Sequence, residues 1–173
     1  MGSKNLKAVA ARGTLDIKIA RPAEALEYNK QFIEQITSAK VNQTQGTLGT
    51  PFIWGATNSW GGVRTRNFQY NQLEYADDVE PERIDEICEE TMGPYHMTGC
   101  FGCQVHCRAQ YKIPSGPYAG KYDEGPEYTS QGAFAGEPGC RSAETVLTGN
   151  HLVDQYGMDN LETGSIISWA MEL

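Results

Sequence analysis

The run Cys100-Phe-Gly-Cys-Gln-Val-His-Cys107 (CFGCQVHC) decides how this 173-residue chain is interpreted. Its C-x2-C-x3-C spacing places three thiols in one short loop, close enough to share a single metal centre. Thiolates are soft ligands that suit iron–sulfur clusters and zinc. We therefore interpret Cys100, Cys103 and Cys107 as three ligands of a [4Fe–4S] cluster, which makes the chain an electron carrier or part of a redox enzyme.

Two other interpretations of the cysteine run stay open. Structural zinc needs four ligands, and a second cysteine pair at zinc-ribbon spacing is missing from the sequence. His96 or His106 could substitute, but His106 adjoins Cys107 and would strain a shared tetrahedral site. Three inert core cysteines are the other alternative. A disulfide framework explains the chain poorly, because its five cysteines are an odd number and three of them are crowded into one run.

The fourth cluster ligand has three candidate sources. Cys88 is expected on a helix among apolar neighbours, which favours a buried structural thiol. Cys140 lies in the Gly/Pro-rich turn GEPGC and is geometrically freer. The third source is a cysteine beyond Leu173.

Composition narrows the class of protein. The net charge of −8 and the lack of a basic patch argue against nucleic-acid binding. No apolar run approaches the roughly 20 residues that a membrane-spanning helix needs. The start, MGSKNLKAVAARG, has no long apolar segment of the kind that a secretory leader carries, so we expect a cytoplasmic protein.

The first half of the chain is expected to form few regular elements. Alternating apolar residues over 5–20 predict one or two strands. Pro22 is expected to start a helix with Leu26, Phe32, Ile33 and Ile36 at helical spacing. Residues 41–79, rich in Gly, Asn, Gln and Thr, are expected as an extended ordered loop.

Helices are expected to dominate the second half. Pro81 predicts a helix with Ile84, Ile87 and Cys88 on one side, and Pro126 a short one. Residues 93–125 are expected as loop with a short strand from Arg108 to Ile113. The segment 141–156 predicts a helix, and the last stretch, SIISWAMEL, is helical in character. The inward side chains of the 141–156 helix are predicted to be Val146, Leu147, Val153 and Tyr156.

A second chemical motif is Asp154–Asp159, DQYGMD. Five residues turn a helix by about 500°, so these two carboxylates do not share a helix face. They converge if Gly157 ends one helix in the left-handed conformation and Asp159 caps the next, with Glu162 as its capping-box partner. Such a corner accepts hydrogen bonds from an NH-rich ligand. An ordinary helix–helix turn is the alternative, and taken alone it is favoured.

Glu127 in GPEY follows Pro126 at the start of a short helix, where the helix dipole stabilises a carboxylate. In isolation this is also a plain structural arrangement. The three histidines, His96, His106 and His151, are interpreted as structural, and His96 and His151 have no evident carboxylate partner in the sequence.

Five motifs occur together in order: MGSKNLKA at the start, TRNF at Thr65 to Phe68, the cysteine run, GPEY and D-x-x-G-x-D. Together they resemble the aldehyde ferredoxin oxidoreductase family, tungsten-dependent enzymes with a bis-pyranopterin cofactor. The resemblance covers essentially the whole chain. It implies a mainly α chain with a short N-terminal β segment, the middle domain of a larger multi-domain oxidoreductase. Residues 1–20 would be the end of an N-terminal β domain that cradles the pterins, and 21–173 the helical domain.

The resemblance also implies roles for individual residues. Cys100, Cys103 and Cys107 match three of four cluster ligands, the fourth lying far downstream. Asp154, Gly157 and Asp159 match the first of two pterin-binding motifs. Glu127 matches a carboxylate close to the tungsten, a candidate for proton handling or substrate orientation.

The implied reaction is oxidation of an aldehyde to a carboxylic acid, with electrons passed to ferredoxin or to an iron–sulfur subunit. The implied cofactors are a [4Fe–4S] cluster and a tungsten or molybdenum bis-pyranopterin. With half of the pterin site and one cluster ligand missing, these 173 residues alone are expected to be inactive. Homo-oligomer formation is left open.

The sequence also offers other functions. Some family members carry a carboxylate six residues before the first Asp of the pterin motif, where this chain has Thr148. The class II benzoyl-CoA reductases, another branch, reduce an aromatic ring with a cysteine on the tungsten, a role Cys140 could fill; the intact GPEY favours the aldehyde-oxidising branch. A stand-alone iron–sulfur electron-transfer module and a truncated product that binds nothing are the remaining alternatives.

Overall fold

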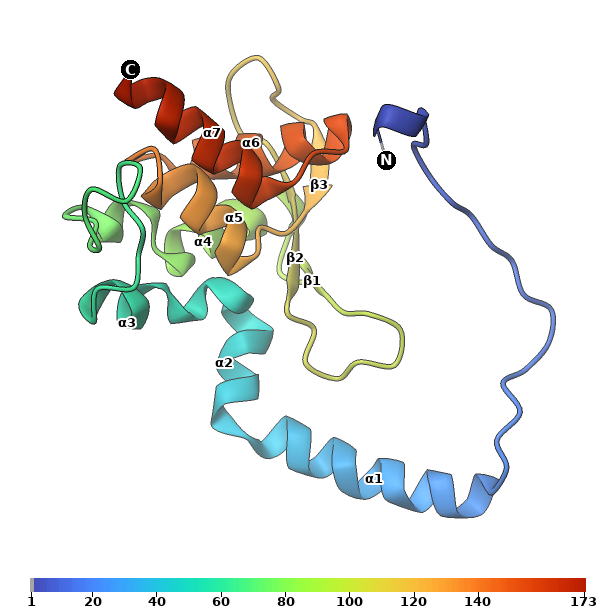
Figure 1. Cartoon of the computed structure of the whole chain (residues 1–173). Helices are drawn as coiled ribbons and strands as arrows, with labels where there is room; N and C mark the ends of the chain where they lie inside the picture. The colour runs from blue at the N-terminus through green and yellow to red at the C-terminus, as the bar shows by residue number, and fades with distance from the viewer. Residues whose placement is uncertain (1) are drawn as a thin grey trace.

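Helices form most of the computed structural model, which describes residues 2–173 (Figure 1). The predicted mainly α class is confirmed. The α-helices are α1 (Pro22–Ser38), α2 (Lys40–Leu48), α3 (Trp54–Ser59), α4 (Pro81–Met92), α5 (Tyr128–Gln131), α6 (Ala143–Tyr156) and α7 (Asn160–Glu172). Short 3₁₀ turns are η1 (Gly2–Lys4), η2 (Thr50–Ile53) and η3 (Ala76–Val79), and η4 (Gly132–Gly136) is a π-helical continuation of α5.

A small antiparallel sheet stands beside the helices. Its strands β1 (Met97–Thr98), β2 (Arg108–Lys112) and β3 (Tyr122–Glu124) lie in that order, with Met97 opposite Ala109 and Tyr111 opposite Asp123. The strand predicted from Arg108 to Ile113 is therefore confirmed. Because β1 and β2 pair on either side of residues 99–107, the sheet holds both ends of the cysteine run; we call these residues the cysteine loop.

Helix α6 separates two hydrophobic clusters and contributes to both. Val146 and Val153 belong to a cluster with Trp54 and Phe134, whereas Leu147 belongs to one with the α4 and β2 side chains. The second cluster contains Ile84, Ile87, Cys88, Tyr111, Ile113 and Ala143. The predicted inward faces of α4 and α6 are thus confirmed, except that Tyr156 is exposed at the last turn of α6.

Glycines let α6 and α7 approach η4 at the centre of the molecule. A Cβ on Gly164 of α7 would lie 2.4 Å from the carbonyl oxygen of Ala133. A Cβ on Gly149 of α6 would lie 2.7 Å from the ring of Phe134. Real Cβ atoms do not approach so closely, so these two helices reach the buried η4 turn only because both positions lack a side chain.

The prediction of a loop over 41–79 is wrong for the first part of this segment, where α2, η2 and α3 form. The composition of this segment is poor in strong helix formers, but tertiary contacts override that preference. Trp54 is fully buried, and its indole N–H donates to the carbonyl of Ala76 at 3.0 Å. A buried aromatic side chain with a satisfied N–H holds α3 and the 60–79 segment together.

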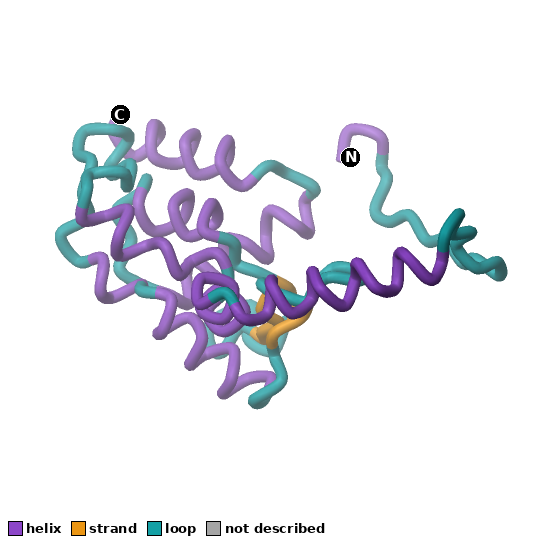
Figure 2. The backbone as a smooth tube through the Cα atoms, turned by 90° about the horizontal axis from the view of Figure 1, so that it is seen from below, coloured by secondary structure: helices purple, strands orange, loops and turns teal. Residues whose placement is uncertain are grey.

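Residues 6–20 do not form the predicted strands but run as an exposed, irregular arm. A strand needs a neighbour for its backbone hydrogen bonds, and none pairs with these residues. Figures 1 and 2 show the arm leading to α1, which projects away from the helical body. The arm touches the body where Lys7 Nζ donates to the carbonyl of Gln155 at 2.6 Å. Met1, the first residue of the MGSKNLKA motif, lies outside the described residues, and the predicted boundary near residue 20 stays a prediction.

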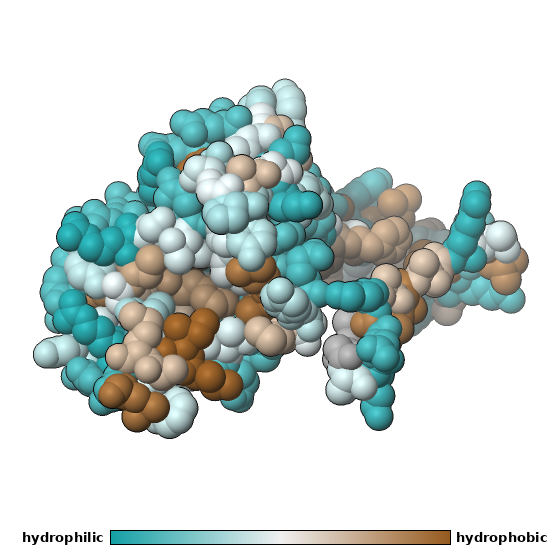
Figure 3. All heavy atoms as spheres, turned by 90° about the horizontal axis from the view of Figure 1, so that it is seen from above, coloured by the Kyte–Doolittle hydropathy of each residue, from teal (hydrophilic) through white to brown (hydrophobic). Residues whose placement is uncertain are grey.

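Apolar side chains are exposed in many parts of the surface, and α1 and α7 each carry several of them. The helix predicted after Pro22 is confirmed, but the face of α1 that carries Leu26, Phe32 and Ile33 is exposed. On α7, Trp169 and Met171 are also exposed, and apolar surface gathers on the upper face of the body (Figure 3). Among the described helices, none has the length and apolarity required to cross a membrane.

Candidate functional site

The cysteine loop crosses the surface between β1 and β2. Cys100 is exposed, whereas Cys103 and Cys107 are half-buried. The loop turns through Gly102 and His106, both with positive φ, of 74° and 56°. His106 is exposed and its ring packs against Gly99, where a Cβ would lie 2.7 Å from the ring.

Helix α2 buttresses this loop through two glycines. A Cβ on Gly46 would lie 2.6 Å from the carbonyl oxygen of Val105, and one on Gly49 would lie 3.0 Å from that of Cys107. Gly49 also has a φ of 67°, which favours glycine. The backbone of the cysteine loop therefore rests directly on the C-terminal end of α2, a contact that the sequence did not reveal.

The surroundings of Cys103 and Cys107 shift the pKa values of their thiols in opposite directions. The backbone N–H of Val105 donates to Cys103 Sγ at 3.4 Å, and this bond, with one from His106, lowers the pKa of the Cys103 thiol. Burial raises the pKa of Cys107, and the neighbouring Glu127 carboxylate raises it further, with smaller contributions from Cys103 and Cys100. The three thiols and Glu127 thus lie close enough for their negative charges to oppose one another.

A cluster is the group that this donor set suits. Soft thiolates with backbone N–H bonds to sulfur are typical of iron–sulfur ligation, and a bound metal centre offsets the crowding of negative charge. Within residues 2–173, no three His, Cys, Asp or Glu side chains are already gathered around one point in a way that would hold a metal ion. The three cysteines remain predicted ligands, and two neighbouring features, an N–H donor and the carboxylate, are added to them.

The other two cysteines lie in different surroundings. Cys88 is fully buried in the cluster with Ile87 and Tyr111, and burial raises the pKa of its thiol to about 12, so it stays neutral as a structural residue. Cys140 is half-buried and lines a groove of about 890 Å³ formed by α6, α7 and residues 115–118.

Glu127 immediately precedes α5, close to the start predicted at Pro126. Its carboxylate Oε2 accepts a hydrogen bond from Thr50 Oγ1, and the same hydroxyl accepts one from the backbone N–H of Tyr128 at 2.8 Å. Glu127 is half-buried. The carboxylate is therefore placed by α5 and by Thr50, the first residue of η2, within electrostatic reach of Cys107.

The backbone of the predicted corner at Asp154–Asp159, which we call the aspartate turn, is confirmed, whereas convergence of its two carboxylates on a ligand stays a prediction. Gly157 adopts the left-handed conformation (φ 64°, ψ 38°) and its N–H donates to the carbonyl of Asp154, while that of Met158 donates to Val153 at 2.9 Å. This is the Schellman arrangement. Asp159 then caps α7, its Oδ1 accepting from the N–H of Glu162 at 2.9 Å.

A buried polar network ties the aspartate turn to the helix that follows Glu127. Asn160 Nδ2 donates to Ser130 Oγ at 2.9 Å, and Ser130 Oγ donates to Asn150 Oδ1 at 2.8 Å. Asn150 in turn donates to the hydroxyl of Tyr111 and to the carbonyl of Glu124, both at 3.1 Å. This network links α5, α6 and α7 and so holds Glu127 in constant relation to the aspartate turn, although Asn160 Oδ1 is buried without a hydrogen-bond partner.

Two histidine–carboxylate pairs correct the prediction that these histidines lack such partners. His151 Nδ1 lies 2.7 Å from Asp123 Oδ2, and His96 Nε2 lies 2.8 Å from Asp85 Oδ1. Both partners come from other elements, so chain spacing gave no sign of them. Partial desolvation raises the pKa of Asp154, and the Asp123 carboxylate raises it further. The carboxyl groups of Asp123 and Asp154 therefore lie close together at the C-terminal end of α6, beside the aspartate turn.

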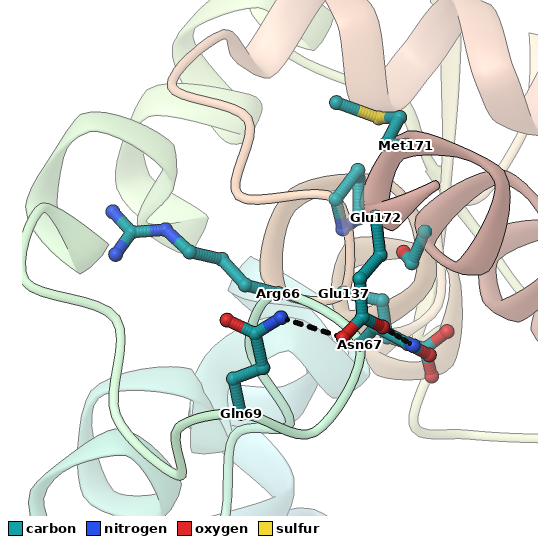
Figure 4. Close-up of a pocket in the computed structure, with 8 residues that line it drawn as sticks. Arg66, Asn67, Gln69, Glu137, Met171 and Glu172 are labelled. Atoms are coloured by element: carbon teal, nitrogen blue, oxygen red, sulfur yellow. Dashed lines mark hydrogen bonds between the residues drawn. The ribbon is translucent and has the colours of Figure 1, made fainter.

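The TRNF motif forms a strained turn at another edge of the body. Arg66, Asn67 and Phe68 have φ values of 49°, 52° and 64°, three consecutive non-glycine residues in the left-handed region. Figure 4 shows Asn67 and Gln69 directed at Glu172 while Arg66 points away. Gln69 Nε2 lies 3.0 Å from Glu172 Oε1, and Asn67 bonds the other oxygen. They line a polar pocket of about 330 Å³ that also includes the buried Glu137 and Ser168.

Comparison with known proteins accounts for these motifs together. Residues 27–173 match the family model described as aldehyde ferredoxin oxidoreductase, domains 2 and 3. The whole chain aligns at 33% identity with a tungsten-containing aldehyde ferredoxin oxidoreductase of Pyrococcus abyssi and at 32% with one of Pyrococcus horikoshii. It aligns at 29% with an aliphatic sulfonate oxidoreductase, WOR-like subunit, of Pyrococcus furiosus. The chain spans 27% of the length of each of these relatives.

Proposed function

Because the chain belongs to the aldehyde ferredoxin oxidoreductase family, we propose that it supplies part of an enzyme that oxidises an aldehyde to a carboxylic acid. The observation that supports this most is the placement of Glu127 between the cysteine loop and the network that leads to the aspartate turn. A proton acceptor, an electron-transfer loop and a ligand-binding corner are then parts of one body.

Each motif has its own task in this proposal. Cys100, Cys103 and Cys107 bind three irons of a [4Fe–4S] cluster, and the fourth ligand comes from outside these residues. The half-buried position of Cys107 and the N–H donated to Cys103 Sγ would tune the potential of that cluster. Asp154 and Asp159 accept hydrogen bonds from the NH groups of a pterin at the corner that Gly157 forms. Glu127 accepts the proton released when water attacks the aldehyde.

The cofactors would supply the redox chemistry: when bound, the tungsten or molybdenum pterin takes two electrons from the aldehyde and the cluster passes them on singly. The chain itself binds, orients and manages protons. Ferredoxin or an iron–sulfur subunit is the proposed electron acceptor, and a cytoplasmic location is proposed with it.

Metal analysis tests the proposal against its main competitor, a stand-alone iron–sulfur carrier. The complete gene product is purified without oxygen and its tungsten, molybdenum, iron and pterin contents are measured. We expect iron together with tungsten or molybdenum and pterin, and aldehyde-dependent reduction of ferredoxin. Iron without pterin would support the carrier instead, and a protein that takes up no iron after reconstitution would rule out both.

The cysteine assignment has a sharper test. Cys103→Ser and Cys107→Ser are expected to remove the visible absorbance of the cluster and most of the iron. Cys88→Ser, at the buried thiol, serves as the matched control and is expected to keep its iron per folded molecule. Equal iron contents in Cys107→Ser and the parent protein would contradict the assignment.

A further inference from the structure

One hydroxyl group connects Glu127 to the start of α5. Thr50 Oγ1 is bonded to Glu127 Oε2 on one side and to the backbone N–H of Tyr128 at 2.8 Å on the other. An amide N–H can only donate, so the hydroxyl accepts there and its single proton is directed at Glu127. The direction of both hydrogen bonds is therefore fixed. Glu127 Oε2 accepts the hydroxyl proton of Thr50, and the other carboxylate oxygen, Oε1, is free of this bond.

The backbone that carries Thr50 is itself constrained. Gly49 precedes it with φ 67° and lies against the carbonyl of Cys107, where a Cβ would be 3.0 Å away. Pro51 follows it and is buried. The hydroxyl is thus held between the cysteine loop and α5, on a backbone that Gly49 and Pro51 constrain.

From this geometry we infer that Thr50 is a positioning residue for Glu127. The inference rests on the proposed function of Glu127 as proton acceptor and deepens it. Thr50 occupies Oε2 and keeps the carboxylate in one rotamer, so that the incoming proton is accepted at Oε1. Thr50 neither gives up its own proton nor touches the reacting atoms; it acts through Glu127.

Two substitutions separate the hydroxyl from the bulk of the side chain. Thr50→Val keeps the β-branched shape and removes both hydrogen bonds, whereas Thr50→Ser keeps the hydroxyl. Thr47→Val is the matched control, because Thr47 lies one turn earlier and its hydroxyl bonds only the carbonyl of Gln43 within α2.

The first readout is structural and independent of activity. Removing an acceptor worth about 1.4 kcal/mol corresponds to a roughly tenfold change in an opening equilibrium. In the complete protein we therefore expect about tenfold faster hydrogen exchange at the Tyr128 amide in Thr50→Val, with a changed ¹³C shift of the Glu127 carboxyl carbon. Thr50→Ser and Thr47→Val are expected to match the parent chain. Unchanged exchange and shift in Thr50→Val would overturn the inference.

The second readout is kinetic and uses the complete enzyme. A misplaced proton acceptor lowers the rate of the chemical step more than it weakens aldehyde binding, so we expect kcat to fall about tenfold or more in Thr50→Val with KM little changed. Thr50→Ser is expected to restore kcat. A Thr50→Ser variant as slow as Thr50→Val would overturn the inference, because bulk rather than the hydroxyl would then matter.

A comparison with Glu127→Gln distinguishes failure of the inference from failure of the proposed function. If Glu127→Gln leaves the rate unchanged while the Tyr128 amide responds to Thr50→Val, the hydroxyl does orient Glu127 but the proton-acceptor role is wrong. If Glu127→Gln is slow and Thr50→Val changes neither the exchange nor the rate, the role stands and the positioning by Thr50 is wrong.

Discussion

The aspartate turn and the cysteine loop differ in what holds their shape. The turn is closed by its own backbone: Gly157 ends α6, Asp159 caps α7, and both helices pack on the buried η4. The loop has an exposed Cys100, two half-buried cysteines and a support on α2, a helix without fully buried residues. A site built on packed helices is preorganised for a ligand, whereas a site on an exposed loop depends more on the ligand itself for its final shape.

Gly164→Ala should have the largest effect on stability, because it disrupts the packing of α7 on η4 behind the aspartate turn. The new Cβ would lie 2.4 Å from the Ala133 carbonyl oxygen, a backbone atom of the buried turn. Overpacking against a backbone atom costs about 3 kcal/mol, so a net loss of about 2 kcal/mol remains after the gain of about 1 kcal/mol in helix propensity. Urea unfolding followed by circular dichroism measures the difference.

Gly132→Ala provides the control for that experiment. Gly132 is helical, and a Cβ there would meet no atom within 4 Å. This variant should be as stable as the parent chain or slightly more stable. If Gly164→Ala unfolds at the same urea concentration as Gly132→Ala, the packing of α7 on η4 does not hold the turn.

Gly46→Ala makes the equivalent change behind the cysteine loop, and its effect should appear elsewhere. The new Cβ would lie 2.6 Å from the Val105 carbonyl oxygen, but the exposed loop can move away. We expect a stability change below about 1 kcal/mol. The displaced loop should retain less iron after anaerobic reconstitution of the complete protein, while Gly55→Ala, where a Cβ meets nothing within 4 Å, should retain the parent content. If Gly46→Ala keeps its full iron content but loses much stability, the cysteine loop does not yield to the new Cβ, and the contrast with the aspartate turn is wrong.

Asp159→Ala tests the cap of the aspartate turn. Loss of the hydrogen bond to the Glu162 N–H should destabilise the chain by about 1 kcal/mol. Asp159→Ser retains a capping oxygen and should recover most of this, although it removes the charge. If Asp159→Ser loses as much stability as Asp159→Ala, the carboxylate acts through its charge and not as a cap.

The same contrast explains what the sequence could predict. The aspartate turn depends on local signals, a glycine followed two residues later by a capping aspartate, and these determined the structure. The starts of α1 and α4 at Pro22 and Pro81 are equally local and were predicted correctly.

Contacts between distant segments could not be found in this way. Thr50 meets Glu127 across 77 positions, and Gly46 meets the cysteine loop because α2 forms in a segment whose composition indicated a loop. The pairing of His151 with Asp123 joins α6 to β3. The arm at 6–20 failed for the opposite reason: its alternating pattern describes a strand, but a strand exists only with a partner.

Asp154→Asn should give the smallest effect, and it appears as a pH dependence. The folded chain raises the pKa of Asp154 through desolvation and the Asp123 carboxylate. Stability from the protonated form is therefore complete below the unfolded pKa and is lost as the pH rises through the higher folded value. Asp154→Asn cannot ionise, so its stability relative to the parent chain should increase as the pH rises through this window.

Urea midpoints across that window measure the difference, with Asp16→Asn on the exposed arm as the control that should run parallel to the parent chain. Parallel curves for Asp154→Asn as well would mean that the carboxylates at the end of α6 do not oppose one another. A difference in urea midpoint that grows with pH would instead show that the ionised Asp154 destabilises the fold. The aspartate turn would then resemble the cysteine loop around Cys107 in its electrostatics, although not in its rigidity, since in both places negative groups are crowded where an NH-rich or cationic partner would relieve them.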